Sequence, residues 1–180
     1  GDDRLAEAVG LDRGRPLLVA GSTGPGEEEL LLAALAHLRT DHPGLQLAVI
    51  PRKPERFEEV ARLIEARGFR CTRRSRLPDG AAPSAAAPTP TEPPAVVLGD
   101  TMGELRKFYA LADVVFVGRS LVPMGGSDLM EVAGLGRPMC FGPHVENFVK
   151  VAERLLEAEA AVQLTGKADL AAVIRRLLVD

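Results

Sequence analysis

The sequence has 180 residues, about the length of one domain, and its 46% apolar and 26% charged content is typical of a globular chain. Its formal net charge of −3 gives no overall basic field of the kind that dominates nucleic-acid binding, so we expect no nucleic-acid partner. No apolar run reaches the roughly 18 residues of a membrane-spanning helix, and the two cysteines match no disulfide, metal or redox spacing. We therefore expect this segment to be soluble, in a reducing, cytosolic compartment.

The first part of the chain alternates short apolar runs with helical patterns, which is typical of a parallel sheet covered by helices. A strand is predicted over 16–20. A helix follows over 27–39, and the three glutamates at its start suit the positive end of the helix dipole. The remaining elements of this part, in order, are a strand over 45–50, a helix from Phe57 that ends at Gly68, and a strand near 69–72.

The second part begins with a stretch rich in proline and alanine at 78–94, whose composition suits neither a strand nor a helix, so a mobile loop is predicted there. The elements after it are, in order, a strand over 95–98, a helix from Met102, a strand over 114–117, a short helix near 128–135, a strand over 138–141, a helix over 148–156, a short strand around 161–164 and a helix over 170–178. This order predicts an α/β fold. We expect a single Rossmann-like domain over 1–180, with a doubly wound, mostly parallel sheet.

Unusual residues collect in the loops that follow five of the predicted strands. These loops are 21–26, 51–54, 99–103, 118–128 and 142–147. Because the carboxyl ends of parallel strands meet at one edge of a sheet, and ligands bind at that edge, the five loops describe a candidate site. The glycine-containing loops also have a purely structural interpretation, since tight connections between strands and helices commonly need glycine.

Two glutamates and a basic pair in these loops have competing interpretations. Thr101 with Glu104, and Asp128 with Glu131, have the spacing of a capping box, so each glutamate has a structural role available besides a ligand role. The basic pair Arg52-Lys53 belongs to the stretch 52–76, in which nine basic residues face four acids, so one interpretation is ordinary solvated surface. The pair also lies between two prolines at the end of a strand. Such a pair suits an anionic ligand, because arginine binds phosphate or carboxylate through two parallel hydrogen bonds.

Missing motifs exclude several classes of site. The loop after the first strand lacks the G-x-G-x-x-G spacing of nicotinamide sites, and Gly166-Lys167 lacks the rest of a P-loop. No serine lies in a G-x-S-x-G elbow, and no Asp or His cluster has the spacing of metal ligands. The sequence therefore predicts an anionic, nucleotide-bearing ligand held by turns and helix ends, without a metal or a further cofactor.

Five motifs in these loops follow one another in an order that resembles a known family. They are Gly21-Ser22-Thr23 with Gly26-Glu27-Glu28-Glu29, Pro51 to Phe57, Asp100 to Leu105, Gly118 to Gly126, and Phe141 to Phe148. Together they resemble the C-terminal half of the 3-deoxy-D-manno-octulosonic acid (Kdo) transferases, over roughly residues 15–150. The resemblance implies a GT-B glycosyltransferase, in which two Rossmann-like domains face a cleft. It also implies metal-free transfer of Kdo from CMP-Kdo to a lipid A precursor, at the cytoplasmic face of the inner membrane in lipopolysaccharide biosynthesis.

The resemblance further implies that this chain is the half that binds the donor, CMP-Kdo or another cytidylate sugar. It places Arg52 at the phosphate or base, the 101–103 turn at the nucleotide and Glu131 at the ribose hydroxyls. The residues expected at the donor are Gly21, Ser22, Arg52, Lys53, Thr101, Met102, Gly103, Ser120, Gly125, Gly126, Ser127, Asp128, Glu131 and Asn147. The acceptor-binding domain, the membrane-associating region and the catalytic carboxylate are expected in a part of the protein that precedes this chain. We therefore expect this fragment to contain no catalytic residue and to be inactive alone.

Several positions depart from the family pattern. The family usually has His where Lys53 stands, Gly where Arg119 stands, His-Asn where Ser127-Asp128 stand, and Pro where Val132 stands. These departures leave three interpretations open at this stage. The chain can belong to a divergent Kdo transferase, to a glycosyltransferase for another nucleotide sugar, or to a nucleotide-binding or interaction module that has lost transferase activity.

Overall fold

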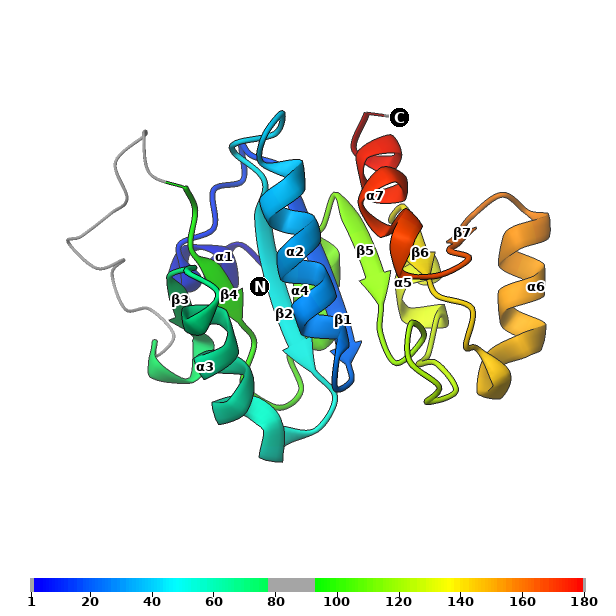
Figure 1. Ribbon diagram of the computed structural model, residues 1–180, viewed down its shortest axis with the longest axis horizontal. Coiled ribbons are helices and arrows are strands. Elements are labelled where there is room, and N and C mark those ends of the chain that lie inside the picture. The colour runs from blue at the N-terminus through cyan, green and yellow to red at the C-terminus, as the bar shows by residue number, and fades with distance from the viewer. Residues whose placement is uncertain (1, 78–92, 180) are drawn as a thin grey trace.

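Seven parallel strands form one sheet at the centre of the computed structural model, which describes residues 2–77 and 93–179 (Figure 1). The strands are β1 (Leu17–Thr23), β2 (Gln46–Pro51), β3 (Cys71–Arg73), β4 (Val96–Leu98), β5 (Val114–Val117), β6 (Met139–Phe141) and β7 (Val162–Gln163). Their spatial order is β3-β4-β2-β1-β5-β6-β7. The predicted α/β class and parallel sheet are confirmed. The predicted loop at 78–94 lies outside the described residues except for its last two prolines.

Helices cover both faces of this sheet. Three of them, α2 (Glu27–Leu38), α3 (Phe57–Ala66) and α7 (Leu170–Val179), pack on the face toward the viewer in Figure 1. Four others, α1 (Asp2–Val9), α4 (Leu105–Leu111), α5 (Met130–Gly134) and α6 (Val149–Glu157), contribute to the core on the other face. Among the described helices, none has the length and apolar character needed to cross a membrane.

Side chains alternate between the two cores along each strand, as the pleat of a strand requires. In β1, Leu18 and Ala20 face the α2 side, whereas Leu17 and Val19 face the α1 side. The other central strands alternate in the same way. A strand buried on both faces is a continuous apolar run in the sequence, which is why these strands were predictable.

The N-terminal helix α1 has no counterpart among the elements predicted from the sequence. Its residues Leu5 and Val9 are buried against the same core as Phe108 of α4. The helix is short, but Leu5 and Val9 have the i, i+4 spacing of one helical face. The sequence therefore carried a signal for this helix, and the prediction missed it.

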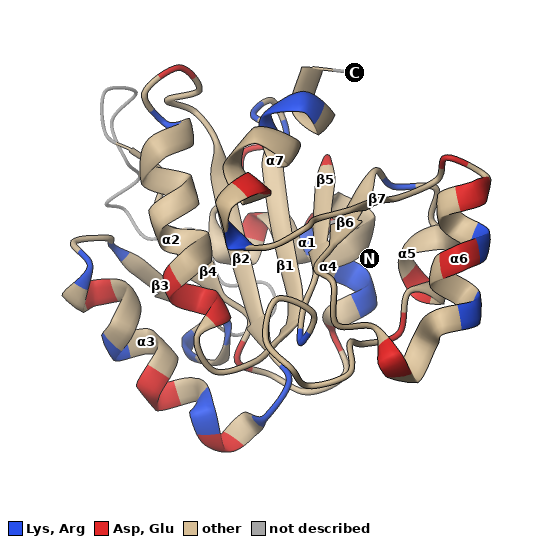
Figure 2. Cartoon of the chain, turned by 45° about the vertical axis from the view of Figure 1, so that its right-hand side comes forward, with Lys and Arg blue, Asp and Glu red and all other residues tan. Residues whose placement is uncertain are grey.

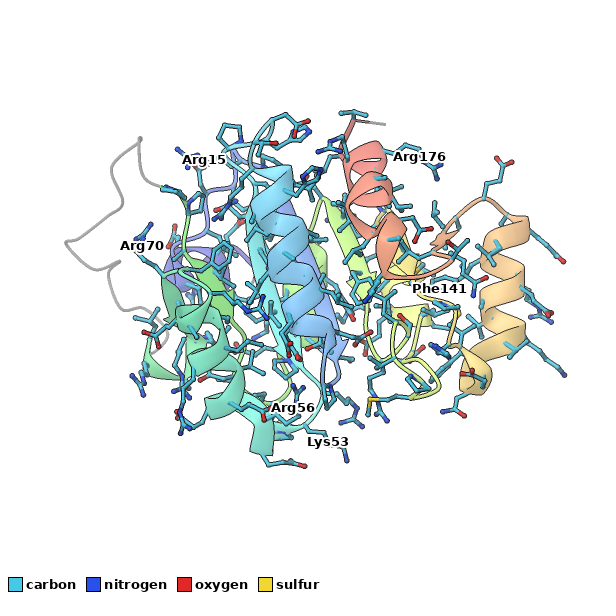
Figure 3. The ribbon with its side chains drawn as sticks, in the orientation of Figure 1. Arg15, Lys53, Arg56, Arg70, Phe141 and Arg176 are labelled. Carbon is cyan, nitrogen blue, oxygen red and sulfur yellow. The ribbon has the colours of Figure 1, made fainter. Side chains whose placement is uncertain are left out.

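The carboxyl ends of the strands all lie at one edge of the sheet, the lower edge in Figure 1. Strand β1 lies between β2 and β5, and the chain leaves β1 toward α2 on one face but leaves β5 toward α5 on the other. Neighbouring connections that leave toward opposite faces define the switch point where ligands of α/β proteins bind. Lys53 and Arg56 lie at this edge, and Arg15 and Arg176 lie at the opposite edge (Figure 3).

Candidate functional site

The loops after β1 and β5 are joined by the buried carboxylate of Glu27, the first residue of α2. One of its oxygens accepts the backbone N–H of Gly24 at 2.9 Å and of Arg119 at 2.6 Å. The other accepts the N–H of Ser120 at 3.1 Å and of Leu121 at 2.9 Å. Because these are charge-assisted bonds to backbone groups, they fix the two loops relative to each other.

The neighbouring Glu28 fixes the loop after β2. Its side chain is completely buried and makes a bidentate pair with Arg56, at 2.8 and 2.9 Å. In the same loop, the N–H of Arg52 donates to the carbonyl of Thr23 at 3.0 Å. Acidic residues begin α2, and acidic and basic residues alternate along α3, as the colours in Figure 2 show. The sequence predicted Glu27 and Glu28 only as partners of the helix dipole, so the links that they make between loops were missed.

The end of β1 contains a bulge at Ser22, which has a φ of +55° and shifts the register with β2. Beside it, the hydroxyl of the buried Tyr109 occupies the space above Gly21. A Cβ on Gly21 would lie only 2.0 Å from the Tyr109 Oη. The packing of α4 therefore leaves no room for a larger residue than glycine at position 21, whether or not a ligand is bound there.

The loop after β5 is held against the loop after β6. The Ser120 hydroxyl donates to a β5 carbonyl at 2.6 Å and accepts the N–H of Gly142 at 2.8 Å, while the Ser120 carbonyl accepts the N–H of His144 at 2.9 Å. The N–H of Asn147 donates to the carbonyl of Gly125 at 3.1 Å. A Cβ on Gly125, which has a φ of +84°, would lie 2.3 Å from the Asn147 Nδ2. The structure thus brings these predicted site residues together.

Asp100, the second residue after β4, fixes the end of β3. Its carboxylate accepts the Nε–H of Arg73 at 2.8 Å, and both the N–H of Ser75 at 2.8 Å and its hydroxyl at 2.6 Å. Burial of Asp100 opposes its ionisation, but the hydrogen bonds from Ser75 and Arg73 outweigh burial and lower the pKa of the carboxyl. This part of the edge is therefore held by an ionised carboxylate.

The capping box predicted from Thr101 and Glu104 is not formed. Helix α4 begins after Glu104 and not at Met102 as predicted, because Gly103 has a φ of +85°, which a right-handed helix cannot contain. The Glu104 carboxylate instead accepts hydrogen bonds from the Thr101 hydroxyl and from the Arg74 guanidinium. Burial opposes ionisation of Glu104, but these bonds outweigh it and lower the pKa of that carboxyl.

The second predicted capping box, formed by Asp128 and Glu131, is also absent. Asp128 accepts the N–H of Met130 at 2.9 Å, two residues farther along the chain, and α5 begins at Met130. Within the two described ranges, the Glu131 carboxylate makes no hydrogen bond or ion pair. Burial raises the pKa of the nearby Tyr109 hydroxyl, and the charge of Glu131 adds to this effect. Glu131 therefore has no structural partner among the described residues that competes with a ligand.

Other residues predicted at the site are exposed along the same edge. Arg52 and Lys53 are exposed, and neither pairs with a carboxylate among the residues that the structure describes. Met102 is 70% exposed and follows β4. In the sheet, β2 lies between β4 and β1, so Met102 follows a strand that is not next to β1. By contrast, Arg56 and Arg73 at this edge are occupied by carboxylates. The basic pair after β2 is thus available to an anionic ligand.

Three buried polar atoms at the end of β1 and in the loop after β5 have no hydrogen-bond partner among the described residues. They are Thr23 Oγ1, Arg119 Nε and Ser127 Oγ. An unpaired buried polar atom costs free energy, so native proteins contain few of them and each needs an explanation. Their concentration around the switch point supports this edge as the functional site.

Comparison with known proteins identifies the family of this chain. No family model matches the sequence. The 3-deoxy-D-manno-octulosonic acid transferase of Haemophilus influenzae is 36% identical over 155 residues, which are 86% of this chain and 34% of that protein. The crystal structure of the C-terminal CMP-Kdo binding domain of WaaA from Acinetobacter baumannii is 30% identical, has a TM-score of 0.84, and matches over 99% of this chain and 87% of that chain. The chain belongs to the Kdo transferase family.

The chain spans about a third of the length of the curated Kdo transferases that it matches. A more distant structure, CalG4, the calicheamicin glycosyltransferase, has a TM-score of 0.51 and 17% identity, over 94% of this chain and 36% of that chain. That likeness concerns the fold alone. Together with the closer match, it confirms the expected fold, that of the C-terminal domain of GT-B glycosyltransferases.

Proposed function

We propose that this chain is the donor-binding half of a Kdo transferase and that its ligand is CMP-Kdo. The observation that carries this proposal is the likeness, at 30% identity, to a domain described as CMP-Kdo binding. The convergence of five loops at the switch point of the sheet supports it, because this is where α/β proteins bind nucleotides.

The residues of this edge suggest how the donor is held. We assign the phosphate or base to Arg52 and the ribose hydroxyls to Glu131, since both side chains lack a partner among the described residues. The turn at Thr101, Met102 and Gly103 and the glycine loop after β5 would surround the rest of the nucleotide. Ser120 and Gly21 support these loops through the packing and hydrogen bonds described above.

For the whole protein, we propose transfer of Kdo to a lipid A precursor at the cytoplasmic face of the inner membrane, in lipopolysaccharide biosynthesis. The acceptor and the catalytic carboxylate would be supplied by a further, N-terminal domain, and the protein would associate with the membrane outside this chain. On this proposal, the chain alone forms a domain that binds the donor but transfers no sugar.

The proposal is tested by calorimetric titration of the 180-residue chain with CMP, CMP-Kdo and AMP. We expect the two cytidylates to bind more tightly than AMP. Glu131→Gln should weaken CMP binding about ten- to a hundredfold, the value of a hydrogen bond to a charged group, with little change in melting temperature. Glu153→Gln, a change of the same kind on the exposed side of α6, is the matched control and should leave binding unchanged. Equal binding of CMP and AMP up to millimolar concentrations would refute the donor-binding function.

A further inference from the structure

Arg119, the second residue of the loop after β5, combines an unusual backbone with an unpaired side chain. Its φ is +58°, in the left-handed region that residues other than glycine rarely adopt. The conformation is fixed on both sides, because the N–H of Arg119 donates to Glu27 at 2.6 Å and its carbonyl accepts the N–H of Gly126 at 2.8 Å. The direction in which the side chain leaves the backbone is therefore determined by the fold.

The stem of the Arg119 side chain is packed into the site. A Cβ on Gly24 would lie 3.4 Å from the Arg119 Cγ and 2.7 Å from the Met124 Sδ, so the two side chains flank Gly24. The Nε of Arg119 is buried and without a hydrogen-bond partner. Within the described ranges, the guanidinium has no carboxylate or carbonyl partner at all.

This arrangement contrasts with that of other arginines at the same edge. Arg56 is neutralised by Glu28, and Arg73 is neutralised by Asp100. Half-burying a guanidinium without a counter-charge costs free energy. A left-handed backbone conformation at an arginine costs free energy as well. Strain and unpaired polar groups of this kind persist in proteins mainly where function uses them.

The position of Arg119 indicates the ligand group that it serves. The basic pair Arg52-Lys53 follows β2, and Arg119 follows β5, so the two basic positions flank the end of β1 on opposite sides. A cytidylate-linked sugar acid carries two separate anions, the phosphate and the sugar carboxylate. Two unpaired basic positions at one edge match two anions on one ligand.

Resting on the proposed function, we propose that Arg119 binds an anionic group of the donor and so selects for donors that carry it. The fork of the guanidinium suits either a phosphate or a carboxylate, since both accept two parallel hydrogen bonds. Arg119 is thus a specificity-determining residue on the opposite side of β1 from Arg52.

The test compares the binding of cytidine, CMP and CMP-Kdo to the 180-residue chain and two variants. Arg119→Met keeps the length of the stem and removes the charge. Arg119→Gly also removes the charge but suits the left-handed backbone, so it should fold with a melting temperature at least as high as that of the parent chain. Arg106→Met, at an exposed arginine of α4, is the matched control and should bind all three ligands as the parent chain does.

We expect both Arg119 variants to weaken binding about ten- to a hundredfold for ligands that carry the recognised anion, and to leave cytidine binding unchanged. A loss for CMP-Kdo but not for CMP assigns Arg119 to the sugar carboxylate. An equal loss for both assigns it to the phosphate. Unchanged binding of both in the two variants would overturn the inference while leaving the proposed function intact. A parent chain that binds none of the three ligands would refute the proposed function and this inference with it.

Discussion

The buried carboxylate of Glu27 offers the sharpest test of how this edge is held together. We consider Glu27→Gln, which preserves the size of the side chain but replaces one carboxylate oxygen with an NH₂ group. In the parent chain, one oxygen accepts from Gly24 and Arg119 and the other from Ser120 and Leu121. Whichever way the glutamine amide is turned, one of these pairs of backbone N–H groups loses its acceptor and faces another donor.

The structure allows the size of this effect to be worked out. Each buried donor left unpaired costs about 1 to 3 kcal/mol, so two of them cost about 2 to 6 kcal/mol. Removing a completely buried charge offsets part of this loss, since burial of a charge is unfavourable. We therefore expect Glu27→Gln to lower the free energy of unfolding by about 3 kcal/mol, or roughly 6 to 12 °C in melting temperature for a chain of this length.

The measurement is equilibrium urea unfolding followed by circular dichroism, together with CMP titration. Glu29→Gln is the matched control, because Glu29 lies in the same first turn but is half-exposed, with a 3.7 Å contact to Arg67. The control should lose only about 0.5 kcal/mol, from its weak interaction with the helix dipole. CMP binding should weaken in Glu27→Gln alone, because the loop after β5 is no longer held. If both variants lose the same small amount of stability, the carboxylate does not hold the loops and the reasoning is wrong.

Two further predictions concern packing and acid stability. Gly21→Ala should lower the free energy of unfolding by about 1 to 3 kcal/mol in thermal or urea unfolding, because the new methyl group would overlap Tyr109. Gly134→Ala, which meets no atom within 4 Å, is its control and should cost nothing; equal effects of the two would contradict the packing argument. Because the pKa of Asp100 is lowered by folding, its contribution is complete above the pKa of the unfolded chain, near 4, and is lost as the pH falls through the folded value. Asp100→Asn should therefore be less stable than the parent chain at pH 7, by about 1 to 3 kcal/mol, with a difference that shrinks in acid; a gap in urea unfolding that stays constant from pH 7 to pH 3 would show that ionisation of Asp100 contributes nothing.

The sequence by itself determined the class of fold and the edge that carries the site. Strands such as β2 and β5 are buried on both faces, so they are mainly apolar runs that can be recognised in the sequence alone. Once several such strands alternate with helices, the sheet is parallel and the loops after its strands share an edge. The position of Arg52 at that edge followed directly, because it lies in one of those loops. Glu131 follows another of them, in the first turn of the short helix α5.

The contacts within that edge were decided only by the tertiary structure. In the sequence, Glu27, Glu28 and Glu29 are three equivalent acids at the start of a helix, yet two of them turn into neighbouring loops and one faces solvent. The partners of Glu27 after β5 lie 92 to 94 residues away along the chain, so no local pattern records them. The spacing that suggested a capping box at Thr101 was misleading for the same reason, since Glu104 accepts a hydrogen bond from Arg74, which follows another strand. Local spacing determines helices and strands through the backbone, whereas the pairing of side chains in loops depends on which elements pack side by side.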